Sequence, residues 1–474
     1  MSNIHYVCLS DMHLGEEDSL LTNLKTDSTD IDTTKPSPVL EELVACLRHL
    51  ISQNKNKKKP TLILNGDILE LALSTTNQAA MAFERFIELV MKPGEELFGK
   101  RILYIPGNHD HHLWEIARET QYVNHISKVR KKARLKVPWH VTNMFVENAQ
   151  SPVQGYFLTN LVKRYFPHVV IEIAYPNFAV LHKEKSRCVI FHHGHFIDPL
   201  YQLITILRNM AFSNREKPSI IWDIEAENFA WIDFFWSALG RSGRAGNDIE
   251  LVYEKMQDED QFRKLLYTMI DNVDRNIDLP GIDLLTARVL KMLARAVVKK
   301  AFQMERKHSE NPLSKNAKKG LRDYMNGPLK ERILNEQEQN MPSDVTFVFG
   351  HTHKPFQEDM NFNGYPQWVN VYNTGGWVVE SMDPQPLHGG AILLVDKDIN
   401  SVSLRLYNEN INSTDYAVKV EESQHVGESS NPFYKQISAL VDPTADPWKK
   451  FSSVVADDII IRRQNLRRRI YDND

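Results

Sequence analysis

Cysteine is scarce in this chain. Its 474 residues include three cysteines, Cys8, Cys46 and Cys188, and none of them belongs to a Cys-x-x-Cys pattern. An odd number of widely spaced cysteines excludes a disulfide framework, and the missing Cys-x-x-Cys pairs exclude the usual structural zinc site. Cys8 and Cys188 fall inside predicted strands, so we expect buried thiols in a reducing compartment.

Long apolar runs and an excess of positive charge are also missing. No stretch of about 20 residues is continuously apolar, which argues against a membrane-spanning helix. The formal net charge is −4, so no global basic field attracts nucleic acid. The first predicted strand begins at Ile4, and we therefore expect no cleaved leader and a cytoplasmic protein.

Five short apolar runs are present, and each ends in Asp, Asn or His. Such runs predict buried strands, and polar side chains at their carboxyl ends mark the edge of an α/β sheet where ligands collect. The runs and the polar residues after them are Tyr6–Leu9 with Asp11 and His13, Leu62–Leu64 with Asp67, Ile102–Ile105 with Asn108, His109 and Asp110, Val189–Phe191 with His192 and His193, and Val345–Phe349 with His351 and His353.

These strand ends predict a metal site. Carboxylate, imidazole and amide ligands without thiolates suit a catalytic Mn, Fe or Zn site. The candidate ligands are too many for one ion but fit two ions that share a carboxylate: Asp11, His13, Asp67, Asn108, His193, His351 and His353. His192 competes with His193, which we prefer because it directly precedes Gly194. The alternative is a polar rim on the sheet without metal.

His109 and Asp110 stay outside this ligand set and are the candidate catalytic residues. A histidine beside the metals can protonate a leaving oxygen, and we expect Asp110 to orient its ring.

In this order, the motifs resemble those of the calcineurin-like metallophosphoesterases. The matching residues are Asp11-Met12-His13, Gly66-Asp67, Gly107-Asn108-His109-Asp110, His193 and Gly350-His351-Thr352-His353. The resemblance implies an α/β fold of two packed mixed β-sheets flanked by helices. It also implies one metal held by Asp11, His13, Asp67 and His353, and a second held by Asp67, Asn108, His193 and His351. A hydroxide between the two ions would attack phosphorus.

The substrate is less specified than the chemistry. Protein Ser/Thr phosphatases of this superfamily carry an Arg soon after Gly-Asp, and none follows Gly66-Asp67 here. Glu70 and a helical insertion make the chain similar to the UDP-diacylglucosamine pyrophosphohydrolase branch, which often has Arg in place of His109. We expect a phosphodiester, pyrophosphate or phosphomonoester, nucleotide- or lipid-linked. A nuclease of the same superfamily and a non-catalytic scaffold are the alternatives.

We predict three parts along the chain. Residues 1–198 and 344–407 form the metallophosphoesterase core, residues 199–343 form a helical insertion that caps the site, and residues 408–474 form a C-terminal extension. Within the insertion, the basic helix around Arg288–Lys300 favours a lid, with contact to a membrane surface as the alternative. The sequence indicates no clear nucleic-acid site and no oligomeric state.

The remaining segments carry local predictions. We expect residues 149–167 to be irregular, residues 169–181 to form one strand that makes a hairpin with 187–191, and the basic stretch Arg462–Arg469 to be a solvated helix.

Overall fold

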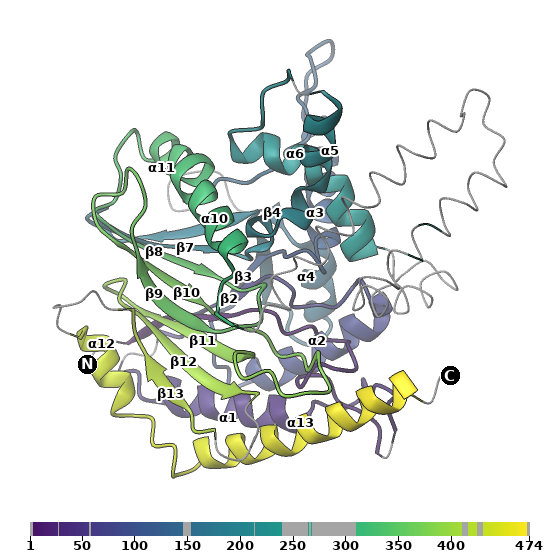
Figure 1. Cartoon of the computed structure of the whole chain (residues 1–474), viewed down its shortest axis with the longest axis vertical. Coiled ribbons are helices and arrows are strands. Elements are labelled where there is room, and N and C mark those ends of the chain that lie inside the picture. Colours follow the sequence, from purple (N-terminus) through teal and green to yellow (C-terminus); the bar gives the residue numbers. More distant parts are fainter. Residues whose placement is uncertain are drawn as a thin grey trace.

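The computed structural model describes residues 3–26, 28–55, 58–145, 153–212, 214–238, 264, 267, 310–409, 416–423 and 430–471. Two mixed sheets lie against each other with helices on their outer faces (Figure 1). The α/β sandwich expected from the motifs is therefore confirmed.

The larger sheet has eight strands in the described part of the chain. Its order is β13 (Lys419–Glu421), β12 (Ser401–Asn408), β11 (Gly389–Asp396), β1 (Ile4–Leu9), β2 (Thr61–Asn65), β3 (Arg101–Ile105), β5 (Val170–Ile173) and β4 (Val153–Gln154). Strands β1, β2, β3 and β5 run parallel, so their carboxyl ends meet at one edge.

The smaller sheet has five described strands. Its order is β6 (Asn177–Leu181), β7 (Arg187–His192), β8 (Asp344–Phe349), β10 (Val369–Asn373) and β9 (Phe356–Met360). Strands β7, β8 and β10 are parallel, with antiparallel strands at both edges.

The predicted apolar runs are buried on both faces. Cys8 and Ile63 pack between the two sheets with Phe191 and Val348, whereas the neighbouring Val7 belongs to the core under the helices. Successive side chains of a strand point to opposite faces, so a strand covered on both sides has an unbroken apolar run.

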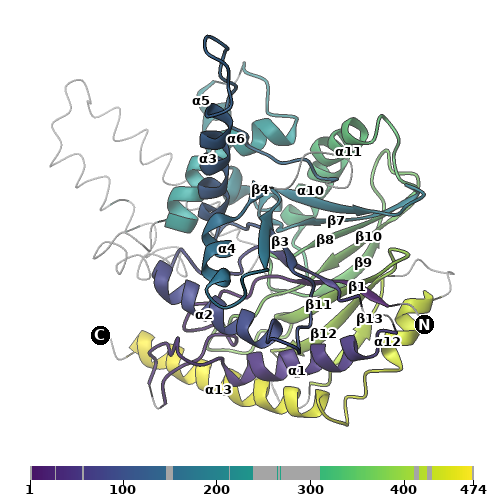
Figure 2. The same cartoon turned by 180° about the vertical axis from the view of Figure 1, so that it is seen from behind.

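The outer face of the larger sheet is covered by α1 (Pro38–Ser52), α2 (Thr76–Val90), α4 (Tyr156–Lys163) and α13 (Trp448–Tyr471) (Figure 2). Helix α1 begins after Ser37, whose side chain accepts a hydrogen bond from the Leu40 N–H at 3.1 Å, with Pro38 in the first turn. On the other side, α10 (Lys315–Tyr324), a π-helical turn (Met325–Leu329) and α11 (Lys330–Glu336) pack on the smaller sheet.

The predicted insertion, residues 199–343, begins with a 3-10 helix (Pro199–Gln202). It continues with α5 (Leu203–Ala211) and α6 (Ile221–Asp233), the latter followed by a π-helical turn (Phe234–Ala238). Helix α6 lies antiparallel to α3 (His112–Ile126): Ser237 accepts from the His112 N–H at 2.9 Å, and Phe229 lies 5.0 Å under the Arg118 guanidinium. The predicted helix around Arg288–Lys300 lies outside the described residues.

Two local predictions were wrong because the boundaries of secondary-structure elements were misplaced. Residues 149–167 include β4 and α4 and are not irregular throughout. The expected strand 169–181 is two strands, β5 and β6, in different sheets, separated at Pro176. Proline has no N–H to donate to a strand neighbour, which favours a break there. The hairpin with β7 is confirmed.

The C-terminal segment packs closely on the core. Phe433 from α12 (Pro432–Ser438), and Trp448 and Phe451 from α13, belong to the same apolar cluster as the helices under the larger sheet. Arg462 was expected to be solvated but is buried, because it donates to the carbonyl oxygens of Glu17 at 2.5 Å and Thr22 at 2.6 Å. Among the described helices, none is both long and apolar enough to cross a bilayer.

Candidate metal centre

Five of the seven candidate ligands have left-handed backbone conformations. The φ angles are +48° at Asp11, +45° at His13, +48° at Asp67, +67° at His351 and +56° at His353. This conformation costs roughly 1–2 kcal/mol for a residue with a Cβ atom. Such strain persists where the surrounding structure imposes it, and it gathers at functional sites.

Two glycines in the motifs allow the loops to approach one another. A Cβ atom on Gly350 would overlap the Asp11 carboxylate, and one on Gly66 would overlap the His193 ring. Glycine is therefore required at both positions for side chains to converge here.

The structure brings six of the seven candidate ligands together in two buried groups. In one, single ligand atoms of Asp11, His13 and His353 lie within 4.8 Å of one another; in the other, the same holds for Asp67, His193 and His351. The Asp67 Oδ2 atom lies 3.1 Å from His193 Nε2 and 3.9 Å from His13 Nε2, so Asp67 stands between the groups.

Asn108 joins the second group through the His193 ring. Its Oδ1 atom lies 3.0 Å from His193 Nε2. Backbone groups hold the carboxylates in place: the His351 N–H donates to Asp11 Oδ1 and the His109 N–H donates to Asp67 Oδ1, both at 2.8 Å.

The donor atoms fit divalent cations. Asp11 Oδ2 and His13 Nε2 are buried and make no hydrogen bond within the described part of the chain, a costly state that a metal ion would relieve. Burial lowers the pKa of His193, but the Asp67 and Asp11 carboxylates raise it to about 9. The local field is therefore negative, as a cation site requires.

Glu70 holds two histidine rings and was not among the predicted site residues. Its Oε2 atom lies 2.8 Å from Nδ1 of His13 and 2.8 Å from Nδ1 of His109. Burial raises the Glu70 pKa, yet the two histidines lower it to about 2. Its Oε1 atom also accepts from the Ala72 and Leu73 N–H groups at 2.7 and 2.9 Å, which fixes the carboxylate.

Asp110 does not make the expected contact with the His109 ring. Its carboxylate accepts hydrogen bonds from the Ile68 N–H at 2.8 Å, the Gly107 N–H at 2.6 Å and the Tyr104 hydroxyl. Asp110 therefore ties the loop after β3 to the loop after β2, and Glu70 is the carboxylate that orients His109. Glu70 lies three residues after Asp67, but this spacing does not indicate a contact with His109.

The insertion contributes two aromatic residues to the centre. The Asn108 amide donates to the Tyr201 hydroxyl at 3.2 Å, and the Tyr201 ring meets the His351 ring edge to face at 4.9 Å between centroids. The ring centroid of the buried Trp236 lies 5.0 Å from that of Tyr201 and 6.2 Å from that of His109. Neither residue was among the site residues predicted from the sequence.

The remaining histidines lie around the centre. His192 is outside both groups, since its Nδ1 atom accepts from the Gly194 N–H at 2.8 Å and its ring packs on Tyr324. His195 is buried with its ring 5.6 Å from that of His193. His112 Nδ1 lies 3.1 Å from Asp233 Oδ1 and links α3 to the insertion.

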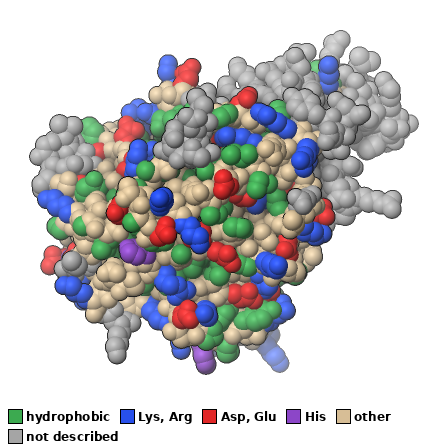
Figure 3. Space-filling model, turned by 90° about the horizontal axis from the view of Figure 1, so that it is seen from below, with side chains coloured by type: hydrophobic (Ala, Val, Ile, Leu, Met, Phe, Trp, Pro, Cys, Tyr) green, Lys and Arg blue, Asp and Glu red, His purple; other side chains and the backbone are tan. Residues whose placement is uncertain are grey.

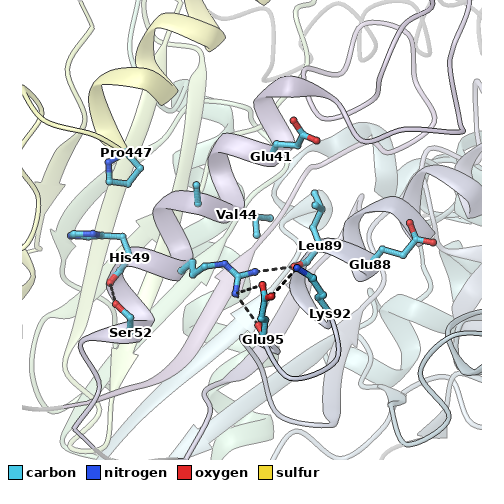
Figure 4. Close-up of a pocket in the computed structure, with 11 residues that line it drawn as sticks. Glu41, Val44, His49, Ser52, Glu88, Leu89, Lys92, Glu95 and Pro447 are labelled. Carbon is cyan, nitrogen blue, oxygen red and sulfur yellow. Dashed lines mark hydrogen bonds and ion pairs between the residues drawn. The ribbon is translucent and has the colours of Figure 1, made fainter.

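A cavity lies away from the candidate metal centre. It lies between α1 and α2 and is lined by Arg48, Glu88, Leu89 and Glu95, among others (Figure 4). The Arg48 guanidinium donates to the Glu95 carbonyl oxygen at 2.9 Å. No residue of the metal centre lines it.

The calcineurin-like phosphoesterase family model matches residues 4–355. This chain belongs to that family. The match begins at β1 and ends just after His353, so all five motifs of this phosphoesterase lie within it. No match was found among curated proteins. Family membership and the clustered Asp and His side chains together support a metal-binding phosphoesterase, a hydrolase of phosphate esters.

Proposed function

We propose that this phosphoesterase is a dinuclear metal-dependent phosphohydrolase that cleaves a phosphodiester or pyrophosphate. The observation that carries the proposal is the pair of three-residue groups with Asp67 between them. When bound, two divalent cations would polarise the phosphoryl group and generate the nucleophile from water.

The ligand roles follow the two groups. The proposed ligands of one ion are Asp11, His13, Asp67 and His353. The proposed ligands of the other ion are Asp67, Asn108, His193 and His351. Carboxylate, imidazole and amide donors suit Mn, Fe and Zn alike. Mn²⁺ is the proposed native metal, and Fe and Zn are the alternatives.

His109 is the proposed proton donor. Because its Nδ1 atom is held by Glu70 at 2.8 Å, Nε2 is the ring atom left to protonate a leaving oxygen. Glu70 keeps the ring in one orientation.

Tyr201 and Trp236 support a substrate with a bulky or apolar group. They place buried aromatic rings beside His351 and His109, and the nucleotide- or lipid-linked part of the ester is proposed to pack against them. We propose the cytoplasm as its place of action, since Cys8, Cys46 and Cys188 are free and buried.

Hydrolysis of two model esters tests the proposal. Bis-p-nitrophenyl phosphate and p-nitrophenyl phosphate are assayed with added Mn²⁺, beside an Asp67→Ala variant whose fold is checked by circular dichroism. Diester hydrolysis that disappears in the variant is expected. Preference for the monoester would overturn the diester assignment, and a folded protein with neither activity nor bound metal would favour the scaffold alternative.

A further inference from the structure

The far end of α3 carries a concentration of positive charge. Residues 123–137, called here the α3 tip, contain no Asp or Glu. Six cationic side chains of the tip are exposed: Lys128, Arg130, Lys131, Lys132, Arg134 and Lys136. On the face seen from below, by contrast, basic and acidic side chains are interspersed (Figure 3).

Large aliphatic side chains are exposed between these cations. Val137 is 69% exposed, Val123 63%, Leu135 48% and Ile126 43%. The neighbouring loop between α5 and α6 adds the exposed Phe212 and Ile220 at its two ends. A surface that combines clustered cations with exposed apolar side chains indicates a partner with negative charge outside and an apolar interior.

The two segments lie at the same end of the molecule. Helices α3 and α6 are antiparallel, because Asp233 at the end of α6 meets His112 at the start of α3, while Trp222 at the start of α6 meets His140, just beyond the tip. Both segments therefore project at the top in Figures 1 and 2. With 15 residues, α3 places the tip roughly 20 Å from the metal centre.

We infer that the α3 tip and the α5–α6 loop form a docking surface for an anionic lipid membrane. The cations bind the headgroups, and the aliphatic side chains enter the boundary between headgroups and acyl chains. Single-stranded nucleic acid is the other anionic partner, but it is bound by stacking of bases on aromatic side chains. Of the six exposed large apolar side chains on this surface, five are aliphatic and one, Phe212, is aromatic. The inference does not depend on the proposed hydrolytic function.

Vesicle sedimentation of the full-length protein tests the inference. Vesicles of phosphatidylcholine alone and of phosphatidylcholine with phosphatidylserine are compared. Binding to the anionic vesicles only is expected, and it should weaken as salt is added. Lys131→Gln/Lys132→Gln/Arg134→Gln should lower the partition coefficient roughly a hundred-fold, since each cation near the surface contributes on the order of five-fold.

Two further variants separate charge from insertion. Leu135→Ser/Val137→Ser keeps every charge and should lower vesicle binding at least about ten-fold, because apolar groups no longer enter the bilayer. The matched control Lys183→Gln/Lys449→Gln/Arg468→Gln removes three exposed cations elsewhere and should change binding less than about two-fold. All variants should keep wild-type circular dichroism.

Three results would overturn the inference. The first is wild-type affinity for anionic vesicles in both tip variants. The second is equal loss in the control triple, which would mean attraction by net charge alone. The third is tight, tip-dependent binding to a labelled oligonucleotide with no binding to vesicles, which would make the partner a nucleic acid.

Discussion

At the scale of single residues, the position of Glu70 distinguishes this centre from a simple ring of ligands. One carboxylate holds the Nδ1 atoms of both His13 and His109, so it fixes a candidate ligand and the candidate proton donor together. Partners of this kind set the ring orientation and the basicity of metal-bound histidines.

Glu70→Gln should lower kcat for bis-p-nitrophenyl phosphate about 10- to 100-fold. The amide still accepts from the Ala72 and Leu73 N–H groups, but it loses the charge and one acceptor that face the rings. The matched control is Glu84→Gln, a buried glutamate on α2 that pairs with Arg164 at 2.8 Å, and its kcat should stay at the wild-type value. An unchanged kcat in Glu70→Gln would remove the orienting role.

His109→Ala should reveal proton donation through its dependence on the leaving group. Hydrolysis of a diester with an alkyl leaving group should fall roughly 10²- to 10⁴-fold. Release of p-nitrophenolate, which needs little protonation, should fall much less. Steady-state kinetics on the two substrates measure this difference, and equal losses on both would contradict the assignment.

Glu225 should make stability depend on pH. It is buried on α6, where its Oε2 atom accepts from the Tyr175 hydroxyl at 2.7 Å, and burial raises its pKa to about 8 from an ordinary 4.5. The unfolded chain loses this proton above about pH 4.5, whereas the folded chain retains it until about pH 8. The contribution of Glu225 to the unfolding free energy is therefore fully present below about pH 4.5. It decreases as the pH rises from about 4.5 to about 8.

Glu225→Gln should flatten that dependence. Between about pH 5 and pH 8 the wild-type unfolding free energy should fall by ~2–4 kcal/mol more than that of the variant. Urea unfolding at several pH values measures the difference. Parallel curves for the two proteins would show that Glu225 does not titrate in this range.

At the scale of elements, the sequence predicted what apolar runs determine and missed what depends on packing. The five motif strands were correct because parallel strands covered on both faces have unbroken apolar runs, and the side chains predicted as ligands at their carboxyl ends lie close together. Strand β9, with the charged Glu358 and Asp359 at an edge, shows no such run and was missed. Glu70 and Tyr201 were missed as site residues because their contacts join distant segments, which spacing along the chain does not reveal.

Arg462 on α13 provides a prediction at this scale. It joins the helix to the loop after the first motif through the Glu17 and Thr22 carbonyl oxygens and also lies 3.2 Å from Asp458. Arg462→Ala leaves these buried acceptors unpaired and should cost ~2–4 kcal/mol of unfolding free energy. Arg468→Ala, at an exposed position of the same helix, should cost less than ~0.5 kcal/mol. Equal midpoints in urea would contradict this account of α13.

At the scale of the whole molecule, two sheets place the two ligand groups against each other. Asp11 and Asp67 come from the larger sheet and His193, His351 and His353 from the smaller one, so the centre lies where the carboxyl ends of both sheets meet. The insertion adds Tyr201 and Trp236 on one side. Each group contains side chains from both sheets, which ties metal binding to the packing of the complete sandwich.

Metal content per chain tests the central claim most directly. The protein is loaded with Mn²⁺, freed of excess metal by gel filtration and analysed by mass spectrometry beside Asp67→Ala. The account predicts about two ions per wild-type chain. Because Asp67 is shared by both proposed sites, Asp67→Ala should lose both ions or retain only weakly bound metal. A wild-type protein that retains less than about one ion, at a level Asp67→Ala does not change, would contradict the dinuclear centre.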